Sequence, residues 1–486
     1  MRPTLQFLDK KLKEQIIEQA ITILCQLGVE IHNKSVISML SDHGAKADLL
    51  KYKVLFTESL IEKTLKTAPS SFKLFDVYGN ETHHFDHNDI YFTPGSTALY
   101  ILDHDGKKMR KPLTEDYIKY VKLVDQLEFI ASQSTAFIPS DVHEKISDSY
   151  RLFLSLLYSK KPVVTGTFTI ESFHIMKELQ LAVRGNDTSL QEKPLTIFSC
   201  CPTSPLKWSD VTSQNVVDCA NSHIPVEFIS MPLSGFMAPV TLVGSLIQHT
   251  AETLSGIVIH QLSNPGAPFL YGGSPAIFDV RYETTPMGAV ESMMIDCAYS
   301  EIGKHLGFAT QAYISLSDAK QLDAQAGLES SMGATLASLC GINNISGPGM
   351  LDFESCQSLE KLVVDNEICA MAYRLIKGIE PREDFPALNL FSELINEKHL
   401  LIADHTLRHL NREINFPGPV IDRANRERWK KEGGSTLGER AHGEVNKHLA
   451  NYQPVTLSES IKKDLIYLME AEARRFGQDT LPKRSM

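Results

Sequence analysis

The chain has 486 residues, of which 43% are hydrophobic and 22% are charged, the proportions of a folded protein with a large core. Its net charge of −11 argues against nucleic acid or an anionic membrane surface as the main partner, since both require clustered cations. No apolar run reaches about 18 residues, so we expect no transmembrane helix.

The beginning of the chain is too polar for a secretion signal, and the eight cysteines form no C-x-x-C pair. Two of them, Cys200 and Cys201, are adjacent. This distribution argues against a zinc site or a disulfide framework and predicts reduced thiols in the cytoplasm.

Residues 1–88 are expected to form a helical cap with a small hairpin. Leu12, Ile16, Ala20 and Leu24 recur at helical spacing, and Gly28 then ends the helix.

From about residue 90 onward, short β-rich runs alternate with longer amphipathic runs. The eight expected strands cover residues 90–93, 128–132, 162–165, 195–200, 225–230, 269–272, 308–311 and 342–346. The expected helices cover residues 114–127, 145–159, 171–184, 209–222, 240–262, 287–305, 319–340 and 358–377.

This alternation implies parallel strands joined by right-handed crossovers. Eight units favour an α/β fold of the (β/α)₈ TIM-barrel type over residues 89–380. An open doubly wound sheet stays an alternative, because periodicity does not prove closure. After Pro381 the pattern breaks, and residues 381–486 are expected to form a helical C-terminal extension that wraps the barrel.

The active site of such a barrel lies at the carboxyl ends of its strands. The residues that follow the expected strands are small, polar or aromatic, and charges are nearly absent there. A sugar-phosphate enzyme would place cations at these ends, and a metal hydrolase would place histidines or carboxylates. The pattern therefore favours a substrate that carries its own positive charge.

Aromatic residues near the strand ends could bind a quaternary ammonium group by cation–π attraction, worth about 0.5–2 kcal/mol per ring. The candidates are Phe92, Phe168, Tyr271 and Tyr313, and core packing is the alternative for each of them. We favour Tyr271 and Tyr313 because they lie at the strand ends themselves.

Two polar side chains are candidates for orienting a substrate carboxylate. Arg281, between Asp279 and Glu283, could pin it through a bidentate contact. A structural ion pair that orders this loop is the alternative. Gln311, at the end of the seventh expected strand, could add a hydrogen bond.

Three further patterns have simpler interpretations. The histidines around His83 suggest a metal site but fit a solvated hairpin better, and His249 with Glu252 fits an outer-face helix pair. Cys200 and Cys201 have no basic partner in sequence and fit packing thiols. We predict no metal site and name no catalytic residue, and no ATP or NAD motif is present.

Several short motifs make the chain resemble the trimethylamine methyltransferase family over roughly residues 10–400. They are LGVEIH (27–32), HGAKAD (43–48), FTPGSTA (92–98), CPTSPL (201–206), GGSP (272–275), DVR (279–281), GPGML (347–351) and VDNE (364–367). The order and spacing of these motifs together carry the resemblance.

The resemblance implies a barrel whose mouth holds the methyl donor and docks a separate corrinoid protein. Archaeal trimethylamine enzymes of the family carry pyrrolysine, whereas this sequence contains only standard residues. It is similar to the branch that demethylates quaternary amines such as glycine betaine, proline betaine or carnitine. The cofactor would be a corrinoid (cobalamin) on the partner protein, with none bound tightly to this chain.

The chemistry agrees with that branch. A quaternary nitrogen already bears its charge and leaves as a neutral amine when cobalt(I) attacks the methyl carbon, so the enzyme needs to supply only alignment and desolvation. Two other classes stay open: a metal-dependent TIM-barrel lyase, and a non-catalytic homologue that binds a betaine or a corrinoid protein. We also expect a homo-oligomer.

Overall fold

The central part of the chain alternates short parallel strands with longer helices. The structure is a computed structural model that describes residues 1–104, 106 and 108–484. The strands are β6 (Tyr91–Thr93), β9 (Gln133–Ser134), β10 (Val163–Thr165), β11 (Thr196–Cys200), β13 (Val226–Ser230), β15 (Phe269–Gly273), β17 (Gln311–Tyr313) and β18 (Asn344–Ser346).

A helix follows each of these strands, and polar side chains define where many of the helices begin. Ser209, Asp323 and Ser358 accept hydrogen bonds from backbone amides in the first turns of α8, α11 and α12. The helices are α4 (Thr114–Gln126), α5 (Ser147–Tyr158), α6 (Ser172–Arg184), α7 (Asp187–Glu192), α8 (Asp210–Ser222), α9 (Leu242–Ser263), α10 (Val290–His305), α11 (Ala324–Cys340) and α12 (Leu359–Ile376).

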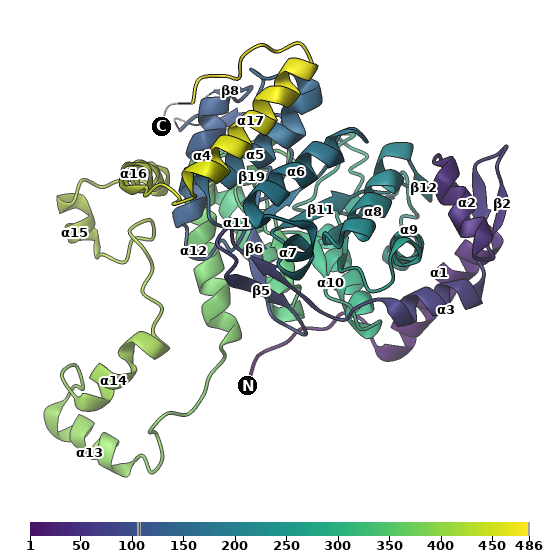
Figure 1. The fold of residues 1–486 in the computed structure, drawn as a ribbon. Coiled ribbons are helices and arrows are strands. Elements are labelled where there is room, and N and C mark those ends of the chain that lie inside the picture. The colour runs from purple at the N-terminus through teal and green to yellow at the C-terminus, as the bar shows by residue number, and fades with distance from the viewer. Residues whose placement is uncertain (105, 107, 485–486) are drawn as a thin grey trace.

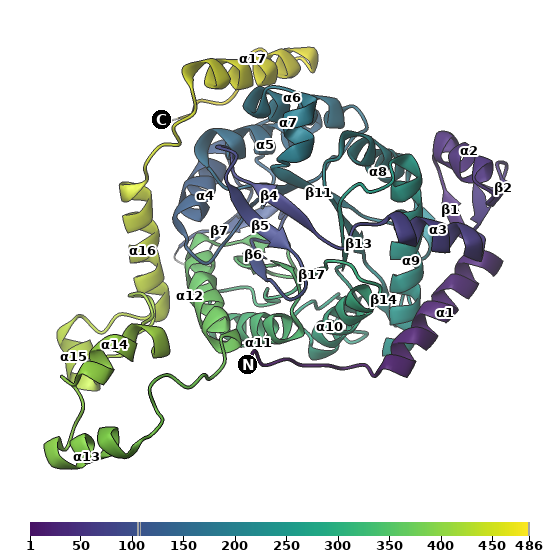
Figure 2. The ribbon, with the colours of Figure 1, turned by 60° about the horizontal axis from the view of Figure 1, so that its bottom comes forward.

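The strands form two parallel sheets, in the orders β15-β13-β11-β10-β9 and β17-β18-β6. A parallel bridge between Tyr271 and Thr310 joins β15 to the start of β17. On the other side, the Ala131 amide donates to the Phe92 carbonyl at 2.8 Å. The helices surround these strands (Figure 2). The mixed α/β alternation expected from the sequence is confirmed.

Two expected strand boundaries are wrong. The strand expected at 128–132 is a turn, because α4 ends at Gln126 and the Asn366 side chain accepts a hydrogen bond from the Phe129 amide at 3.0 Å. The strand itself is β9, at Gln133–Ser134. The strand expected at 308–311 lies later, as β17.

A hairpin of β4 (Phe72–Phe75) and β5 (Glu81–Phe85) lies across the amino ends of the strands. Its Leu74 and Phe85 pack with Val164, Ile197 and Leu270 in one buried cluster. The hairpin therefore covers the end of the strands opposite to the expected active site (Figure 2).

The remaining N-terminal elements pack on the outside of α9. They are α1 (Lys10–Gln26), α2 (Lys34–Asp42), α3 (Glu58–Thr67), β1 (Val29–Ile31), β2 (Lys46–Asp48) and β3 (Lys53–Leu55). β1 pairs in parallel with β12 (Lys207–Trp208), which ties this part to the loop after β11. The part lies on the right of Figure 1.

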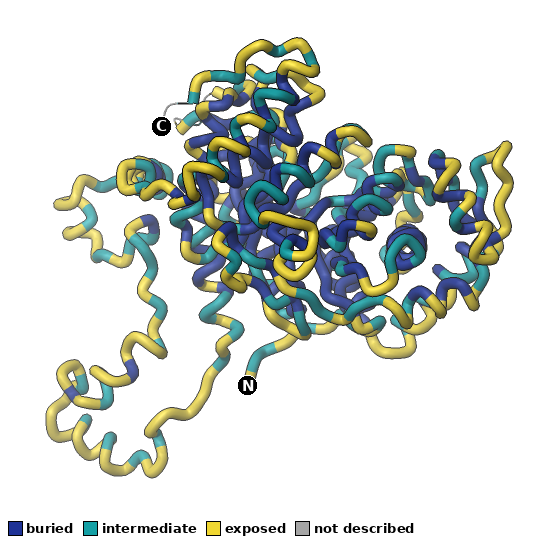
Figure 3. Tube along the Cα trace, in the orientation of Figure 1, coloured by how far each residue is buried: buried dark blue, intermediate teal, exposed yellow. Residues whose placement is uncertain are grey.

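The C-terminal part is helical and leaves the body before it returns. Its helices are α13 (Leu388–Glu397), α14 (Asp404–Glu413), α15 (Arg426–Lys431), α16 (Leu437–Asn451) and α17 (Glu459–Arg475). α16 packs on α12 and α4, and α17 packs on α5 and α6. α13 and α14 project from the body and are exposed along most of their length (Figures 1 and 3).

Short elements decorate the carboxyl ends of the strands. They are β7 (Tyr100–Leu102), β8 (Met109–Arg110), η1 (Glu144–Ile146), β14 (Leu233–Ser234), β16 (Ala276–Ile277), β19 (Met350–Leu351) and β20 (Cys356–Gln357). In the described part of the chain, we find no helix with the length and apolar character that crossing a membrane requires.

Candidate active site

A cavity of about 410 Å³ opens at the carboxyl ends of the strands. We call it the mouth cavity. Its wall combines hydroxyl groups from several strand ends with two aromatic rings, one carboxyl group and one guanidinium group. The hydroxyls of Thr165 and Thr167 are buried there without a hydrogen-bond partner among the described residues. Such groups are available to a polar ligand.

Glu227 lies on β13 beside this cavity and is fully buried. Ser199 Oγ donates to its Oε1 at 2.7 Å, and Asn344 Nδ2 donates to its Oε2 at 3.2 Å. Thr93 Oγ1 in turn donates to Asn344 Oδ1 at 2.8 Å and fixes that amide. Burial raises the pKa of Glu227 to about 7, although the two hydrogen bonds favour the ionised form.

Glu354 is the carboxyl group in the cavity wall, on the turn between β19 and β20. Its Oε1 accepts a hydrogen bond from the Ser96 amide at 3.4 Å. Burial, together with a smaller effect of the charge of nearby Glu227, raises the pKa of Glu354 to about 8. Asp352, Phe353 and Glu354 all have positive φ, of 50°, 56° and 67°. Such a conformation is uncommon for residues with a Cβ, so this turn holds the carboxyl group at a cost in backbone strain.

Arg151, on α5, provides the cation of the cavity wall. Its Nε donates to the Ser147 carbonyl at 3.1 Å and its Nη1 donates to the Thr135 carbonyl at 2.7 Å. The guanidinium lies 4.8 Å from the ring centroid of Phe168. Its Nη2 donates no hydrogen bond within the described residues. Burial lowers the pKa of Arg151, but an arginine remains charged at neutral pH.

Tyr313 closes another side of the cavity, at the end of β17. Its hydroxyl lies 2.6 Å from Ser96 Oγ. Burial raises the pKa of Tyr313 well above its usual value, so the phenol stays neutral. Cys201 also lines the cavity, and burial raises the pKa of its thiol to about 12. It is therefore a thiol and not a thiolate nucleophile at neutral pH.

The structure brings only part of the predicted site together. Tyr313 and Phe168 line the mouth cavity, although one face of Phe168 is already covered by Arg151. Gln311 is buried; its Oε1 accepts from the Gly273 amide at 3.2 Å, and its Nε2 has no partner among the described residues.

The other three candidates lie elsewhere. Tyr271 is fully buried against α9 and α10, and its hydroxyl donates to Thr250 Oγ1 at 3.3 Å. Phe92 packs edge-on against Tyr373 of α12, with ring centroids 5.5 Å apart. Because successive strand residues point to opposite faces, these two rings face the helices and not the interior. Arg281 is exposed and its Nη2 lies 2.6 Å from Asp279 Oδ2, which is the loop-ordering ion pair.

Two of the simpler interpretations need correction. His83 is not solvated: it is buried under the strands, Ser132 Oγ lies 3.0 Å from its Nε2, and burial lowers its pKa to about 3. His249 and Glu252 are also fully buried and not on an outer face. In the described part of the chain, no three His, Cys, Asp or Glu side chains are grouped so that they could hold a metal ion.

Sequence reasoning missed the charged groups of the mouth cavity. Glu227 lies inside an expected strand between apolar neighbours, and Glu354 and Arg151 lie in segments that did not directly follow an expected strand end. An isolated carboxylate within a run of buried β residues was the one available signal, because such a group is rarely buried without a role. The expectation of a mouth nearly free of charge is therefore wrong.

Exposed apolar side chains surround the mouth cavity, in the loops after β6, β10, β13 and β15. They are Leu99, Phe168, Ile170, Met231, Phe236, Val280 and Tyr282. The ring of Phe236 stacks on that of Phe278, with centroids 4.9 Å apart. We call these side chains the apolar rim.

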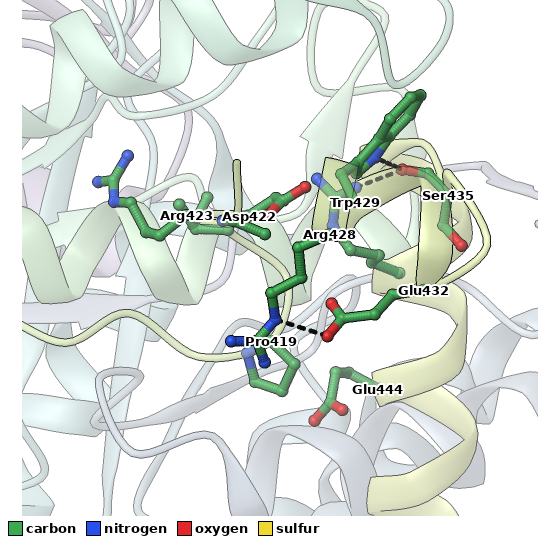
Figure 4. A pocket seen from close by; sticks show the side chains of 11 residues that line it. Pro419, Asp422, Arg423, Arg428, Trp429, Glu432, Ser435 and Glu444 are labelled. Carbon is green, nitrogen blue, oxygen red and sulfur yellow. Dashed lines mark hydrogen bonds and ion pairs between the residues drawn. The ribbon is translucent and has the colours of Figure 1, made fainter. Parts of the chain in front are cut away.

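A second cavity, of about 580 Å³, lies between the segment 419–435 and α16 (Figure 4). Several of its polar groups are already paired within the chain. Arg428 Nε lies 2.7 Å from Glu432 Oε1, and Arg440 Nε donates to the Val420 carbonyl at 2.9 Å. Trp429 Nε1 donates to the Ser435 carbonyl at 3.2 Å. This cavity is the seam where the segment meets α16, far in the fold from the strand ends.

The family model described as trimethylamine methyltransferase (MTTB) matches residues 1–476. The chain belongs to the trimethylamine methyltransferase family. Because the family and its named relatives are methyltransferases, the chain is a transferase.

Relatives match along almost their whole length. Trimethylamine methyltransferase MttB of Desulfitobacterium hafniense (strain DSM 10664 / DCB-2) is 27% identical over 457 residues, covering 94% of this chain and 92% of the relative. Glycine betaine methyltransferase of D. hafniense (strain Y51) is 27% identical over 479 residues, covering 98% and 99%. Trimethylamine methyltransferase MttB of Methanosarcina thermophila is 30% identical over 467 residues, covering 94% and 95%.

Among solved structures, the chain resembles the monomethylamine methyltransferase MtmB of Methanosarcina barkeri. The TM-score is 0.52 at 13% sequence identity, and the match covers 93% of this chain and 90% of the other. At this identity the likeness concerns the fold alone.

Proposed function

We propose that this chain transfers a methyl group from a quaternary amine that carries a carboxylate, of the glycine betaine type, to the cobalt(I) corrinoid of a partner protein. The resemblance to a glycine betaine methyltransferase over 98% of the chain supports this substrate class. The observation that carries the proposal is the charge pattern of the mouth cavity.

The carboxyl groups of Glu227 and Glu354 have no Lys, Arg or His partner within ion-pair distance among the described residues. Each is held only by neutral donors: Ser199 and Asn344 for Glu227, and the Ser96 amide for Glu354. A buried carboxylate without a cation is costly, and a permanently cationic ligand removes that cost. Tyr313 adds an aromatic wall, but the carboxyl groups supply most of the attraction.

Arg151 places a positive charge in the wall of the cavity, in addition to the carboxyl groups. Its Nε and Nη1 are used by backbone carbonyls, whereas its Nη2 is free of protein partners in the described residues. A substrate carboxylate beside this guanidinium would gain a charge-assisted hydrogen bond. The cavity therefore suits a zwitterion, with the ammonium toward Glu227 and Glu354 and the carboxylate toward Arg151. Arg281 no longer serves this role.

The residues of this chain need to align and desolvate the methyl donor and to compensate the loss of the positive charge on its nitrogen. The reduced corrinoid of the partner would supply the nucleophile: a new bond to the methyl carbon would form as the C–N bond breaks, the electron pair of that bond would stay on nitrogen, and a neutral tertiary amine would leave. Because the charge on nitrogen disappears, a carboxyl group with a pKa near neutrality can be ionised beside the cation and take up a proton beside the amine. Glu354, whose pKa is raised to about 8, suits this exchange at its Oε atoms.

A corrinoid partner must approach the open end of the mouth cavity. The apolar rim defined by Leu99, Phe236, Val280 and their neighbours surrounds that end and would bury its exposed side chains under such a partner. We also infer that the strands close a (β/α)₈ barrel, supported by the backbone contacts at Tyr271–Thr310 and Ala131–Phe92. The eight free cysteines agree with a cytoplasmic location.

The test mixes the full chain with a cobalt(I) corrinoid protein and a panel of glycine betaine, proline betaine, carnitine, choline and trimethylamine. We expect the corrinoid absorption spectrum to change, with loss of one methyl group from a carboxylate-bearing quaternary amine. Substrate binding is measured separately as a rise in melting temperature, since a ligand of the folded state stabilises it.

The two readouts separate the alternatives. Binding of a betaine with no methyl transfer to any corrinoid protein would support the non-catalytic homologue. A melting temperature that responds to a divalent metal but to no amine would favour the metal-dependent lyase. Transfer from trimethylamine alone would contradict the zwitterionic cavity.

A further inference from the structure

The segment 379–416 projects from the body and exposes an unusual number of large apolar side chains. We call this segment the arm. Its side chains that are more than half exposed are Ile379, Phe385, Leu388, Phe391, Ile395, Leu401, Ile402, Leu407, Ile414 and Phe416. Monomeric proteins rarely expose so much contiguous apolar surface, so the arm is built to be covered.

The exposed side chains follow helical stripes. In α13, Leu388, Phe391 and Ile395 are three and four residues apart and share one face; no residue of this helix is buried. Leu407 of α14 and Ile414, the residue that caps the carboxyl end of this helix, lie on a similar stripe. Helices of ten residues are marginal in water by themselves, so their stability must come from packing of these faces.

Ion pairs nevertheless give the arm a defined shape. Arg408 Nη1 lies 2.6 Å from Glu383 Oε2, and Arg382 Nε lies 2.8 Å from Glu413 Oε1. Arg374, on α12, donates to the Glu413 carbonyl at 3.0 Å and fixes the root of the arm. These charged groups are thus paired with one another, whereas the apolar stripes of the arm are left to solvent.

The chain also carries an apolar groove, on the outer face of α11. Leu328, Met332 and Leu336 recur at four-residue spacing along a groove of about 660 Å³, whose wall is almost entirely apolar. Leu328 is 72% exposed. Other barrel helices are packed under outer elements: α9 under α1 and α3, α12 under α16, and α6 under α17. By contrast, the outer face of α11 leaves Leu328 exposed to solvent.

We propose that the arm of one copy lies in the α11 groove of a second copy, and that the exchange is reciprocal. The arm emerges from the end of α12, beside α11, and points away from its own body (Figures 1 and 2). The contact of Arg374, on α12, with the Glu413 carbonyl holds it in that direction. A two-fold pair lets each arm reach the groove of its partner, which makes the interface self-complementary.

The available area is sufficient for a stable dimer. The ten side chains of one arm expose on the order of 100 Å² each, so two arms with their grooves would bury more than about 2,000 Å². That is the range of permanent homodimers, whose interfaces are apolar as these two surfaces are.

The experiment measures the mass of the full-length protein by sedimentation equilibrium between low and high micromolar concentration. We expect the wild type to be a dimer of the 54.2 kDa chain. The double variant Phe391→Asp/Ile395→Asp and the double variant Leu328→Asp/Met332→Asp should each dissociate roughly a hundredfold more readily, because charges enter the buried core of the interface. Asn389→Asp, exposed on α13 outside the stripe, should leave the dimer unchanged.

Mixing the two double variants gives the sharpest outcome. In a mixed pair, the arm of the groove variant and the groove of the arm variant are both intact. The mixture should therefore form heterodimers at concentrations at which each variant alone is a monomer. A monomeric wild type would overturn the proposal, since it means that the arm folds back or stays free. Dimers that survive the groove variant but not the arm variant would overturn the assignment of α11 and indicate contact between arms. Melting temperatures check that each variant is folded.

Discussion

Glu354, in the wall of the mouth cavity, and Glu227, beside it, should both respond to a bound cation. Their pKa values are raised to about 7 for Glu227 and about 8 for Glu354 because both lie away from bulk water. In the empty cavity they hold protons near neutral pH. A bound quaternary ammonium stabilises the ionised forms, so binding releases protons.

We predict that betaine affinity increases as pH rises from 6 to 8 and levels off above about 9. Below its pKa each carboxyl must lose a proton to pair with the cation, which costs about 1.4 kcal/mol per pH unit. Calorimetric titration of the folded chain at several pH values checks this. Glu354→Gln should weaken binding and flatten the profile, whereas Glu62→Gln, exposed on α3, should do neither. A profile that falls with pH would contradict the carboxylate role.

Arg151 should determine the preference of the cavity for a quaternary amine that carries a carboxylate over one that does not. Arg151→Met keeps the aliphatic length but removes the guanidinium next to Phe168 and the cavity. We expect the preference for glycine betaine over tetramethylammonium to fall roughly tenfold or more, the loss of one charge-assisted hydrogen bond. The ratio of the two dissociation constants is the measurement, because a general loss of stability changes both constants alike. Arg281→Met should leave the ratio unchanged.

At the scale of elements, the family motifs hold the strand-end loops in place. Asp365 of the VDNE motif accepts from the Gly349 amide of the GPGML motif at 2.6 Å and pairs with buried Lys361 at 2.5 Å. Glu252 on α9 accepts from Ser204 Oγ, the Leu206 amide, Ser230 Oγ and Gln248 Nε2 at 2.6–3.0 Å. It thereby fixes the CPTSPL loop to β13. Glu252, expected on an outer helix face, is therefore an anchor for the cavity wall.

Glu252→Ala should lower the melting temperature by several degrees, because it leaves four donors, two of them buried, without their acceptor, at about 1–3 kcal/mol for each buried donor that finds no other partner. Glu252→Gln keeps one oxygen for the Leu206 and Gln248 donors and can donate to the two serines, so its effect should be smaller. Differential scanning calorimetry compares the two with Glu62→Ala. An alanine variant as stable as the wild type would mean that the loop is held by other contacts.

At the scale of the whole molecule, the mouth cavity makes the fold sensitive to pH. Glu227 and Glu354 bind protons more tightly in the folded chain than in the unfolded chain, whose glutamates have a pKa near 4.5. Stability therefore falls as pH rises from about 4.5 to about 8. Lys161 acts in the opposite direction above pH 7, because burial lowers its pKa to about 7.

We predict that the double variant Glu227→Gln/Glu354→Gln loses less stability than the wild type between pH 6 and pH 8.5. The difference between the two proteins isolates the glutamates, since Lys161 is common to both. Glycine betaine should stabilise the wild type more at pH 8.5 than at pH 6. Equal pH dependence in the two proteins would show that neither carboxyl is protonated in the folded chain.

The sequence by itself determined the alternation of strands and helices, the family and the class of chemistry. These follow from local periodicity, caps such as Ser209 and Asp323, and motifs at strand ends. Only the tertiary structure decided which side chains come into contact. Tyr271 and Phe92 turned outward because a shift of one residue along a strand reverses the direction of its side chain. Glu354 and Arg151 reached the mouth cavity through a strained turn and a helix face, which no spacing in the chain encodes. Burial also set the pKa values of the glutamates, since desolvation depends on everything packed around a group and not on its neighbours in sequence.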